Sequence, residues 1–378
     1  MARRCHFTRP LTLAVALVAT LNLSCAIPAE PTRPANVVQA ATAIALGQAV
    51  PAPPTPGPTA SRVPTREFLP RVEGRLIVGR DTTIDVIEAG INRTVFEAAA
   101  GGSVKEPRFS PDGKQVVFAY APPRPDLPAD APLADQLIYS DILVADLGSR
   151  THRVAVAHDR PGTILETPIW APDAGSIVHA YYSPVYEGRR LAGQVSEIRR
   201  SFPDGRTETI AADGLYPALT PSGSHLVYVH ESRADGLSLR VRELGTGSER
   251  VLVPAVRFQA VRSPVVSPDG MTVAFGGAGA APEARSSPPI ARLTSLLVSS
   301  AEAHGLPWEI WTVPLTGGTA RQLTQFSEDS PACAWARDGA HLLCLGGGGL
   351  YRVRADGTAT EALLDHGAHG GLDWRWFG

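Results

Sequence analysis

Residues 107–120 read PRFSPDGKQVVFAY, and this stretch decides the fold. At its centre Pro111 sets the backbone angle φ for a turn, Asp112 can bond its own backbone, and Gly113 is free to take a positive φ. Apolar and polar residues alternate on both sides of the turn, as they do in strands with one buried face. The stretch therefore predicts a β-hairpin that turns at Asp112.

The same pattern returns four times along the chain. It is found in PIWAPDAGSIVHAYY (168–182), PALTPSGSHLVYVHE (217–231), PVVSPDGMTVAFGG (264–277) and ACAWARDGAHLLCLG (332–346). Two further strand patterns joined by a polar turn follow each hairpin, so that each unit predicts four antiparallel strands. Successive turns, at Asp112, Asp173, Ser222, Asp269 and Asp338, are 61, 49, 47 and 69 residues apart. Blades of a β-propeller take about 40 to 50 residues, so the longer intervals indicate insertions.

The two ends of this repeating region complete a sixth unit. Residues 74–98 supply three strand patterns but lack the leading hairpin strand, whereas the tail GGLDWRWFG (370–378) supplies one strand and then stops. We expect residues 371–377 to pair beside residues 74–80, because a closed ring leaves only short strand edges exposed. A loose tail is the alternative, but its aromatic residues would expose a large apolar patch. The predicted fold class is all-β, a six-bladed β-propeller of four-stranded antiparallel blades.

These phrases resemble the TolB-type propeller repeat of bacterial envelope proteins, which is related to the WD-repeat. The resemblance covers roughly residues 74–378, and its best copies are Phe109-Ser110-Pro111-Asp112-Gly113 and Val266-Ser267-Pro268-Asp269-Gly270. It implies a propeller fold, which such families use in envelope complexes, as the gate of prolyl oligopeptidases and in lipoproteins associated with sensor kinases. TolB itself carries an amino-terminal α/β domain, and the short, proline-rich residues 26–73 do not resemble one.

The amino-terminal segment predicts export. Three arginines precede an apolar run over residues 11–23, which is too short to span a bilayer but typical of a secretory signal. Ser24-Cys25 resembles a bacterial lipobox, which would make Cys25 the lipidated residue; an ordinary cleaved signal is the alternative. We therefore expect a signal peptide over residues 1–25, which contains Cys5, a Pro/Ala/Thr-rich disordered tether over 26–70 and the propeller over 71–378. The predicted location is the extracytoplasmic face of a bacterial cell membrane.

Composition and motifs limit the classes of function. The net charge is −2, so no basic surface predicts nucleic-acid binding. No nucleophile-elbow, zinc-protease or clustered Cys/His motif is present. His366 and His369 could contribute to a metal site, but a solvated turn explains them as well. The sequence therefore predicts a protein that is not an enzyme and that needs no cofactor.

Residues at the start of each hairpin phrase are the candidates for a binding site. In a propeller these residues lie on the innermost strands, around the central channel. We assign Glu106, Thr167, Tyr216, Ser263, Asp329 and Asp373 as channel-mouth candidates, with Glu166 and Ala332 beside them. Carboxylates in this position could bind Ca²⁺, although a polar, water-filled channel explains them equally.

Two cysteines in the last hairpin phrase face each other if Trp335 pairs with Leu342. In that register Cys333 lies opposite Cys344, and an exported protein meets an oxidising environment. A disulfide is possible, and two buried thiols are the alternative.

Two insertions interrupt the blades, at residues 121–136 and 276–307. Apolar residues in the second, from Ile290 to Leu297, recur at helical spacing and predict a short amphipathic helix. Loops on a rigid scaffold often carry function, so both segments are candidate partner surfaces, or else tolerated surface insertions.

The predicted function is a binding or scaffolding module for a protein, peptide or glycan in the cell envelope. The expected protein is monomeric and attached to the membrane by its lipid. One alternative is a lyase or hydrolase that uses channel-mouth carboxylates, with or without Ca²⁺. Another is an accessory subunit of a membrane sensor or transporter.

Overall fold

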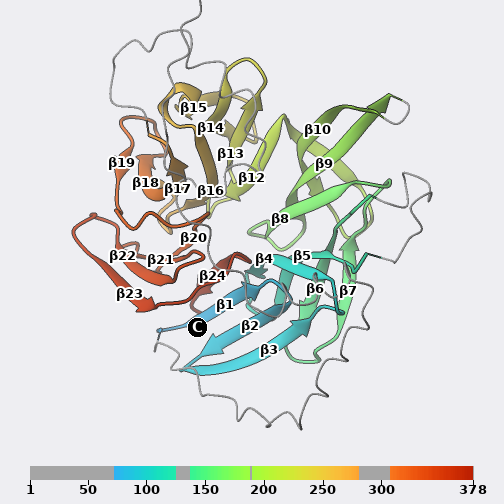
Figure 1. Cartoon of the computed structure of the whole chain (residues 1–378), viewed down its shortest axis with the longest axis horizontal. Helices are drawn as coiled ribbons and strands as arrows, with labels where there is room; N and C mark the ends of the chain where they lie inside the picture. Colours follow the sequence, from blue (N-terminus) through green and yellow to red (C-terminus); the bar gives the residue numbers. More distant parts are fainter. Residues whose placement is uncertain (1–71, 125–136, 188–189, 281–306, 378) are drawn as a thin grey trace, which may run out of the picture. The chain divides into compact units, whose positions relative to one another are not determined.

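A computed structural model of the 378-residue chain describes residues 72–124, 137–187, 190–280 and 307–377. The predicted signal, Cys5, Cys25 and the tether lie outside these described residues. Within them the chain forms six four-stranded antiparallel sheets and one short 3-10 helix, η1 (Ala255–Arg257). The sheets are the six blades of a β-propeller, as the repeats predict (Figure 1).

The first three blades contain β1 to β11 and the last strand of the chain. Blade 1 is ordered β24 (Leu372–Arg375), β1 (Arg75–Arg80), β2 (Thr83–Glu88) and β3 (Ile91–Glu97). Blade 2 is ordered β4 (Ser103–Phe109), β5 (Gln115–Ala121), β6 (Asp141–Asp146) and β7 (His152–Val156). Blade 3 is ordered β8 (Ile164–Trp170), β9 (Ile177–Glu187), β10 (Arg190–Ser201) and β11 (Thr207–Ala212).

The other three blades follow in chain order. Blade 4 is ordered β12 (Gly214–Leu219), β13 (His225–Ser232), β14 (Gly236–Glu243) and β15 (Glu249–Val253). Blade 5 is ordered β16 (Ala260–Val266), β17 (Thr272–Ala278), β18 (Trp308–Pro314) and β19 (Arg321–Gln322). Blade 6 is ordered β20 (Ala332–Trp335), β21 (His341–Leu345), β22 (Leu350–Arg354) and β23 (Thr360–Leu364).

The hairpin phrase folds as its residues require. The Ser110 hydroxyl donates to Asp112 Oδ1 at 2.6 Å, and the backbone N–H of Lys114 donates to the same oxygen at 3.1 Å. Gly113 takes a φ of 69°, which favours glycine. The phrase at Ser267 and Asp269 repeats this arrangement with a hydroxyl distance of 2.5 Å. Each of these two turns is therefore held by its own serine and aspartate.

The hydrophobic core lies between neighbouring blades. In one cluster Ile77 and Ile84 of blade 1 pack with Phe109 and Phe118 of blade 2, and all four side chains are fully buried. Further clusters join blades 4 and 5, blades 5 and 6, and blades 6 and 1. Each blade is thus stabilised by burial against its neighbours.

The last strand closes the ring, which confirms the pairing predicted from the two chain ends. β24 pairs antiparallel with β1 (Figure 1). In this register Trp374 lies opposite Leu76 and Asp373 opposite Ile77. The Trp374 indole N–H donates to the Glu73 carbonyl at 2.7 Å. Phe377 packs edge-on against Phe109 with ring centroids 5.2 Å apart. The aromatic tail is therefore part of the fold and ties blade 1 to blade 2.

Both predicted insertions connect the second and third strands of a blade. Their bounds differ slightly from the prediction, because Ala121 belongs to β5 and residues 276–278 belong to β17. Backbone pairing with the neighbouring strands extends these two strands further than the glycine and proline content suggests. The predicted helix near Ile290 lies outside the described residues.

Candidate functional site

Four of the six innermost strands carry the same backbone feature near the centre of the ring. In β4, β8, β12 and β16 the pairing register shifts by an extra residue, which defines a β-bulge. At each bulge the residue before a proline has a positive φ, an uncommon conformation for a side chain other than glycine. In the described chain the six equivalent positions are Glu106 (57°), Thr167 (50°), Tyr216 (51°), Ser263 (47°), Ser330 (50°) and Gly371 (79°).

Four of the six channel-mouth candidates occupy these positions, and two do not. In blade 6 the position belongs to Ser330, one residue after Asp329, and in blade 1 it belongs to Gly371, two residues before Asp373. The blade 6 phrase is two residues longer between its X-Pro step and its turn than the others, so the spacing of the other phrases points to Ala332, and the assigned candidate, Asp329, is one residue from Ser330. The Ser330-Pro331 pair was the available signal for the correct position.

Asp373 instead joins two blades. Its Oδ2 accepts the backbone N–H of Phe109 at 3.0 Å, and its carboxylate also pairs with Arg375 at 3.1 Å. The side chain is buried, with 6% of its surface exposed. These contacts show that Asp373 connects blade 1 to blade 2.

Glu106 connects three blades at the centre. Its backbone N–H donates to the Gly370 carbonyl in blade 1 at 2.5 Å, and its Oε2 accepts the backbone N–H of Thr167 in blade 3 at 2.5 Å. Burial, followed by repulsion from Glu166, raises the pKa of Glu106 to about 7, although Arg262 opposes the shift. Glu106 is therefore a carboxyl group that changes its protonation state near neutral pH.

Aromatic and charged side chains from four blades surround Glu106. Glu166 lies 4.0 Å from the ammonium group of Lys105. Burial raises the pKa values of the Tyr182 and Tyr216 hydroxyls, so both are neutral hydrogen-bonding groups. These two tyrosines interact electrostatically with Glu106, Glu166 and Glu231. We call the following set the central cluster: Glu106, Glu166, Tyr182, Tyr216, Glu231 and Arg262.

Arg262 is held in this cluster by aromatic rings and by a glycine. Its guanidinium carbon lies 5.4 Å from the centroid of the Tyr216 ring and 5.7 Å from that of Trp308. A Cβ atom at Gly276 would lie 3.3 Å from the Arg262 stem and 3.5 Å from the Trp308 ring. Glycine at this position therefore leaves room for the arginine to lie against Trp308.

The central cluster lies toward one side of the ring. Tyr182 pairs with Ile164, where β8 begins, Glu231 lies near the end of β13, and Trp308 begins β18. In each blade this end of the strands also carries the connection between the second and third strands. The two insertions therefore leave their blades on the same side as the cluster.

Sequence reasoning identified only part of this cluster. Glu106 and Tyr216 were candidates, with Glu166 noted beside them. Arg262 directly precedes the candidate Ser263, so its position in the repeat could have revealed it. Tyr182 and Glu231 come from second strands, and only the assembled blades bring them to the centre.

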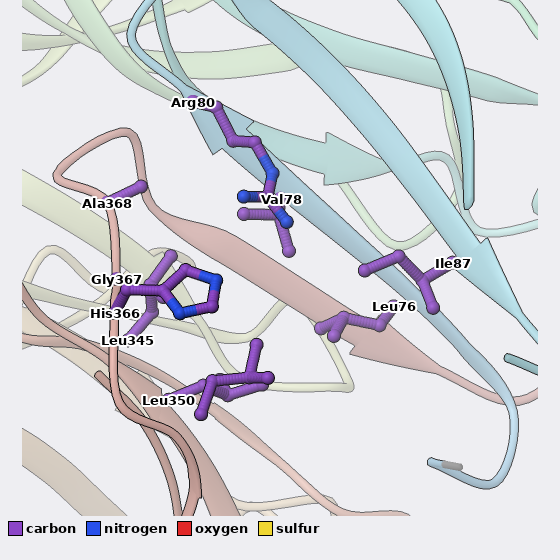
Figure 2. Close-up of a pocket in the computed structure, with 10 residues that line it drawn as sticks. Leu76, Val78, Arg80, Ile87, Leu345, Leu350, His366, Gly367 and Ala368 are labelled. Carbon is purple, nitrogen blue, oxygen red and sulfur yellow. The ribbon is translucent and has the colours of Figure 1, made fainter. Parts of the chain in front are cut away.

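Two cavities lie elsewhere and differ in what they could hold. One, between blades 1 and 6, is lined by Leu76, Val78, Leu350 and His366 (Figure 2). Its volume of about 10 Å³ suffices for no more than one water molecule. The other, of about 370 Å³, lies between blades 5 and 6 on the side of the hairpin turns, next to Asp269 and Arg321. Arg321 already donates to the carbonyls of Ala355 and Asp356.

Cys333 and Cys344 lie in blade 6 in the predicted register. They are directly paired between β20 and β21, and their Cα atoms are 4.1 Å apart. A disulfide joins them in the structure, with an S–S distance of 2.08 Å. Both residues are buried in the cluster between blades 5 and 6.

The described residues contain no group of three or more His, Cys, Asp or Glu side chains placed to hold a metal ion. His366 contacts Asp365 at 3.1 Å, and the His369 ring lies against Gly347. In the same part of the chain no helix is long and apolar enough to cross a membrane.

Comparison with known proteins supports the fold. No family model matches the sequence, and no curated protein is significantly similar to it. The crystal structure of TolB from Acinetobacter baumannii is similar with a TM-score of 0.55 and 16% identity, over 80% of this chain and 66% of that chain. The chain thus spans slightly less than two thirds of that TolB. A putative TolB from Agrobacterium tumefaciens is similar with a TM-score of 0.52 and 14% identity, over 81% and 95% of the two chains. The described chain is a TolB-like six-bladed β-propeller.

Proposed function

We propose that this protein is an exported binding or scaffolding module, whose propeller recognises a protein, peptide or glycan in the cell envelope. The observation that carries the proposal is the central cluster, where charged and aromatic side chains of four blades meet. Tyrosine, tryptophan and arginine are the side chains that dominate binding energy at interfaces. The two insertions leave their blades on the same side, so a partner could contact both.

We further propose that Cys25 carries a lipid and that residues 26–70 tether the propeller to the extracytoplasmic face of the membrane. A chain of about 40 residues spans roughly 35 Å as a flexible coil. In this arrangement the propeller is a monomer that reaches partners close to the membrane. Mass measurement of the amino-terminal peptide from membranes would detect the lipid, and an unmodified Cys25 would contradict this part of the proposal.

The binding proposal is tested by photo-crosslinking of the full-length protein in cells. A crosslinker placed at Glu231 reports on the cluster side, and one placed at Met271, which is 67% exposed, reports on the hairpin side. We expect an identified envelope partner to crosslink at Glu231, and to be lost in a Tyr216→Ala variant that still folds. Crosslinking only at Met271, or a partner unaffected by the Tyr216 change, would contradict the proposal. The identity of the partner also distinguishes an accessory subunit of a sensor or transporter from a free binding module.

A second function is favoured by one specific observation. A carboxyl group whose pKa is raised toward neutral pH can act as a general acid or base. Glu106 has a pKa raised to about 7 beside Glu166. A lyase or hydrolase acting in the channel is therefore the alternative. It predicts turnover of an envelope polymer that Glu106→Gln abolishes while binding remains. If a metal takes part, a chelator abolishes turnover by the unaltered protein and added Ca²⁺ restores it.

A further inference from the structure

Arg262 is a charged group that forms no close ion pair among the described residues, although its charge favours ionised Glu106 from farther away. Among the described residues its one hydrogen bond joins Nε to the Ser263 hydroxyl at 3.4 Å, and none of their carboxylates forms an ion pair with it. The side chain is half-buried between Tyr216 and Trp308. Most arginines of comparable exposure on the blades are paired, as Arg199 is with Glu197 at 2.7 Å and Arg240 with Glu249 at 2.7 Å. A half-buried charge of this kind is stabilised when an anion binds it.

The arrangement around Arg262 also fixes how it can bind. Its stem occupies the space over Gly276, and two rings flank its guanidinium, so the side chain is ordered before a ligand arrives. A planar guanidinium matches a carboxylate with two parallel hydrogen bonds. The neutral hydroxyls of Tyr182 and Tyr216 lie in the same cluster and can donate further hydrogen bonds.

We propose that Arg262 is the anchor of a ligand-binding site at the central cluster, and that it binds a carboxylate of the ligand. This inference rests on the proposed binding function and names the chemistry of the ligand. A carboxylate can come from an acidic sugar or from the carboxyl terminus of a peptide, and the experiment separates these two sources.

Binding of a carboxylate here is coupled to protonation of Glu106. The charged or titratable groups that interact with Glu106 are Lys105 on its own strand and Glu166, Tyr182, Tyr216 and Arg262 on other strands. Glu231 interacts with the two tyrosines. Arg262 is the cation from another blade that favours ionised Glu106, and a ligand anion bound to it neutralises that charge. Glu106 therefore takes up a proton when the ligand binds, and affinity falls as the pH rises through about 7. A ligand amine would instead bind to the carboxylates of Glu106 and Glu166. Its positive charge would favour ionised Glu106, so Glu106 would release a proton on binding.

The experiment uses the full chain and two pairs of probes. One pair is glucuronate and its uncharged methyl ester, and the other is acetyl-Ala-Ala with a free or an amidated carboxyl terminus. Binding is followed by the indole N–H resonance of Trp308, assigned with a Trp308→Phe variant, and by calorimetry in two buffers of different ionisation enthalpy. We expect one acid to bind at least tenfold more tightly than its uncharged partner, with uptake of a proton. The acid that binds identifies the source of the carboxylate.

Variants locate the binding at Arg262. Arg262→Gln is expected to lower the affinity at least tenfold, and Arg262→Lys is expected to keep part of it. Arg153→Gln, which removes the same charge from an exposed residue of β7, is expected to leave the affinity unchanged. If Arg262→Gln does not fold, the comparison of each acid with its uncharged partner still decides the question in the unaltered protein.

Three results would overturn the inference: equal binding of acid and uncharged partner, release of a proton, or no binding of either acid at tens of millimolar. If these occur while the crosslinked partner is still captured through Glu231, the proposed function stands and only the carboxylate anchor falls.

Discussion

At the scale of single residues, the centre of the ring is set by six backbone positions. Each places a residue at positive φ, and in five of the six this residue carries a side chain and precedes a proline. Such a conformation persists where the surrounding structure determines it. At Glu106 two hydrogen bonds provide that determination: its backbone N–H donates to blade 1, and its carboxylate accepts from blade 3. The same contacts hold the carboxyl group in a poorly solvated place, which is why its pKa is raised.

The raised pKa of Glu106 makes stability depend on pH. The folded protein holds this proton up to about pH 7, whereas the unfolded chain releases it near 4.5. The contribution is complete below pH 4.5 and is lost as the pH rises to 7, on the order of 1–2 kcal/mol once partial exposure is allowed for. In Glu106→Gln we expect this loss to disappear, measured by urea unfolding between pH 5 and 8.

His179 changes stability in the opposite direction, so only a comparison of variants isolates Glu106. Burial lowers the pKa of His179 to about 4, and its contribution is lost as the pH falls from 6.5 to 4. Glu97→Gln is the matched control, because it removes the same charge from an exposed side chain of β3, outside the central cluster. An unfolding free energy of Glu106→Gln that follows the wild-type pH profile would contradict the assignment.

At the scale of elements, the hairpin is the unit that sequence predicts best. Its serine, aspartate and glycine act within a few residues, so the local sequence contains the whole explanation of the turn. The bulge earlier in the same strand was harder to predict, because its φ depends on contacts with other blades. Blade 6 shows the difference: its phrase has two extra residues, and the assigned candidate, Asp329, lies one residue before Ser330, although the Ser-Pro pair was visible.

Two glycines allow the free-energy cost of an unfavourable backbone conformation to be measured apart from the cost of a steric clash. Gly113 has a φ of 69°, and a Cβ there would lie 2.5 Å from the Phe377 ring. Gly205 has a φ of 87°, and nothing lies within 4 Å of its added Cβ. Gly205→Ala is expected to cost about 1 kcal/mol from backbone strain. Gly113→Ala should cost at least about 1 kcal/mol more, because Phe377 must move. Equal unfolding free energies for the two variants would show that the tail does not pack on this turn.

The cysteine pair tests the exported location as well as the hairpin. In protein purified from membranes without reductant, we expect Cys333 and Cys344 to resist alkylation. The alkylating reagent should increase the intact mass at these two residues only after reduction. The loop between them spans 11 residues, and closing a loop of this size stabilises by roughly 3 kcal/mol in the chain-entropy account. Full alkylation of both thiols in the denatured, unreduced protein would exclude the bond.

At the scale of the whole molecule, the ring depends on pairing between the two ends of the described chain. The sequence predicted this closure because each end had a strand pattern that the other lacked. It did not predict which side chains meet at the centre, because Tyr182, Glu231 and Arg262 come from different strands of different blades. The repeats thus predict the architecture, whereas the central cluster is made of residues that are not repeated from blade to blade.

Trp374 is the residue on which closure most depends. It is 7% exposed, and its indole donates to the Glu73 carbonyl. Trp374→Ala should lower the free energy of unfolding by about 3–5 kcal/mol, measured by chemical denaturation. Ile91→Ala, at a residue of β3 that is 70% exposed, should change it by less than about 0.5 kcal/mol. Similar values for the two variants would show that the last strand contributes little to the ring.

The position of β24 determines when the protein can fold. A ribosome makes β1 early and β24 only at the end of the described chain, so blade 1 stays incomplete during nearly all of synthesis. A chain that must cross a membrane has to remain unfolded until it has passed through the translocation pore. For the exported protein proposed above, the closing strand leaves the pore after the other described strands, so the ring closes only on the far side of the membrane.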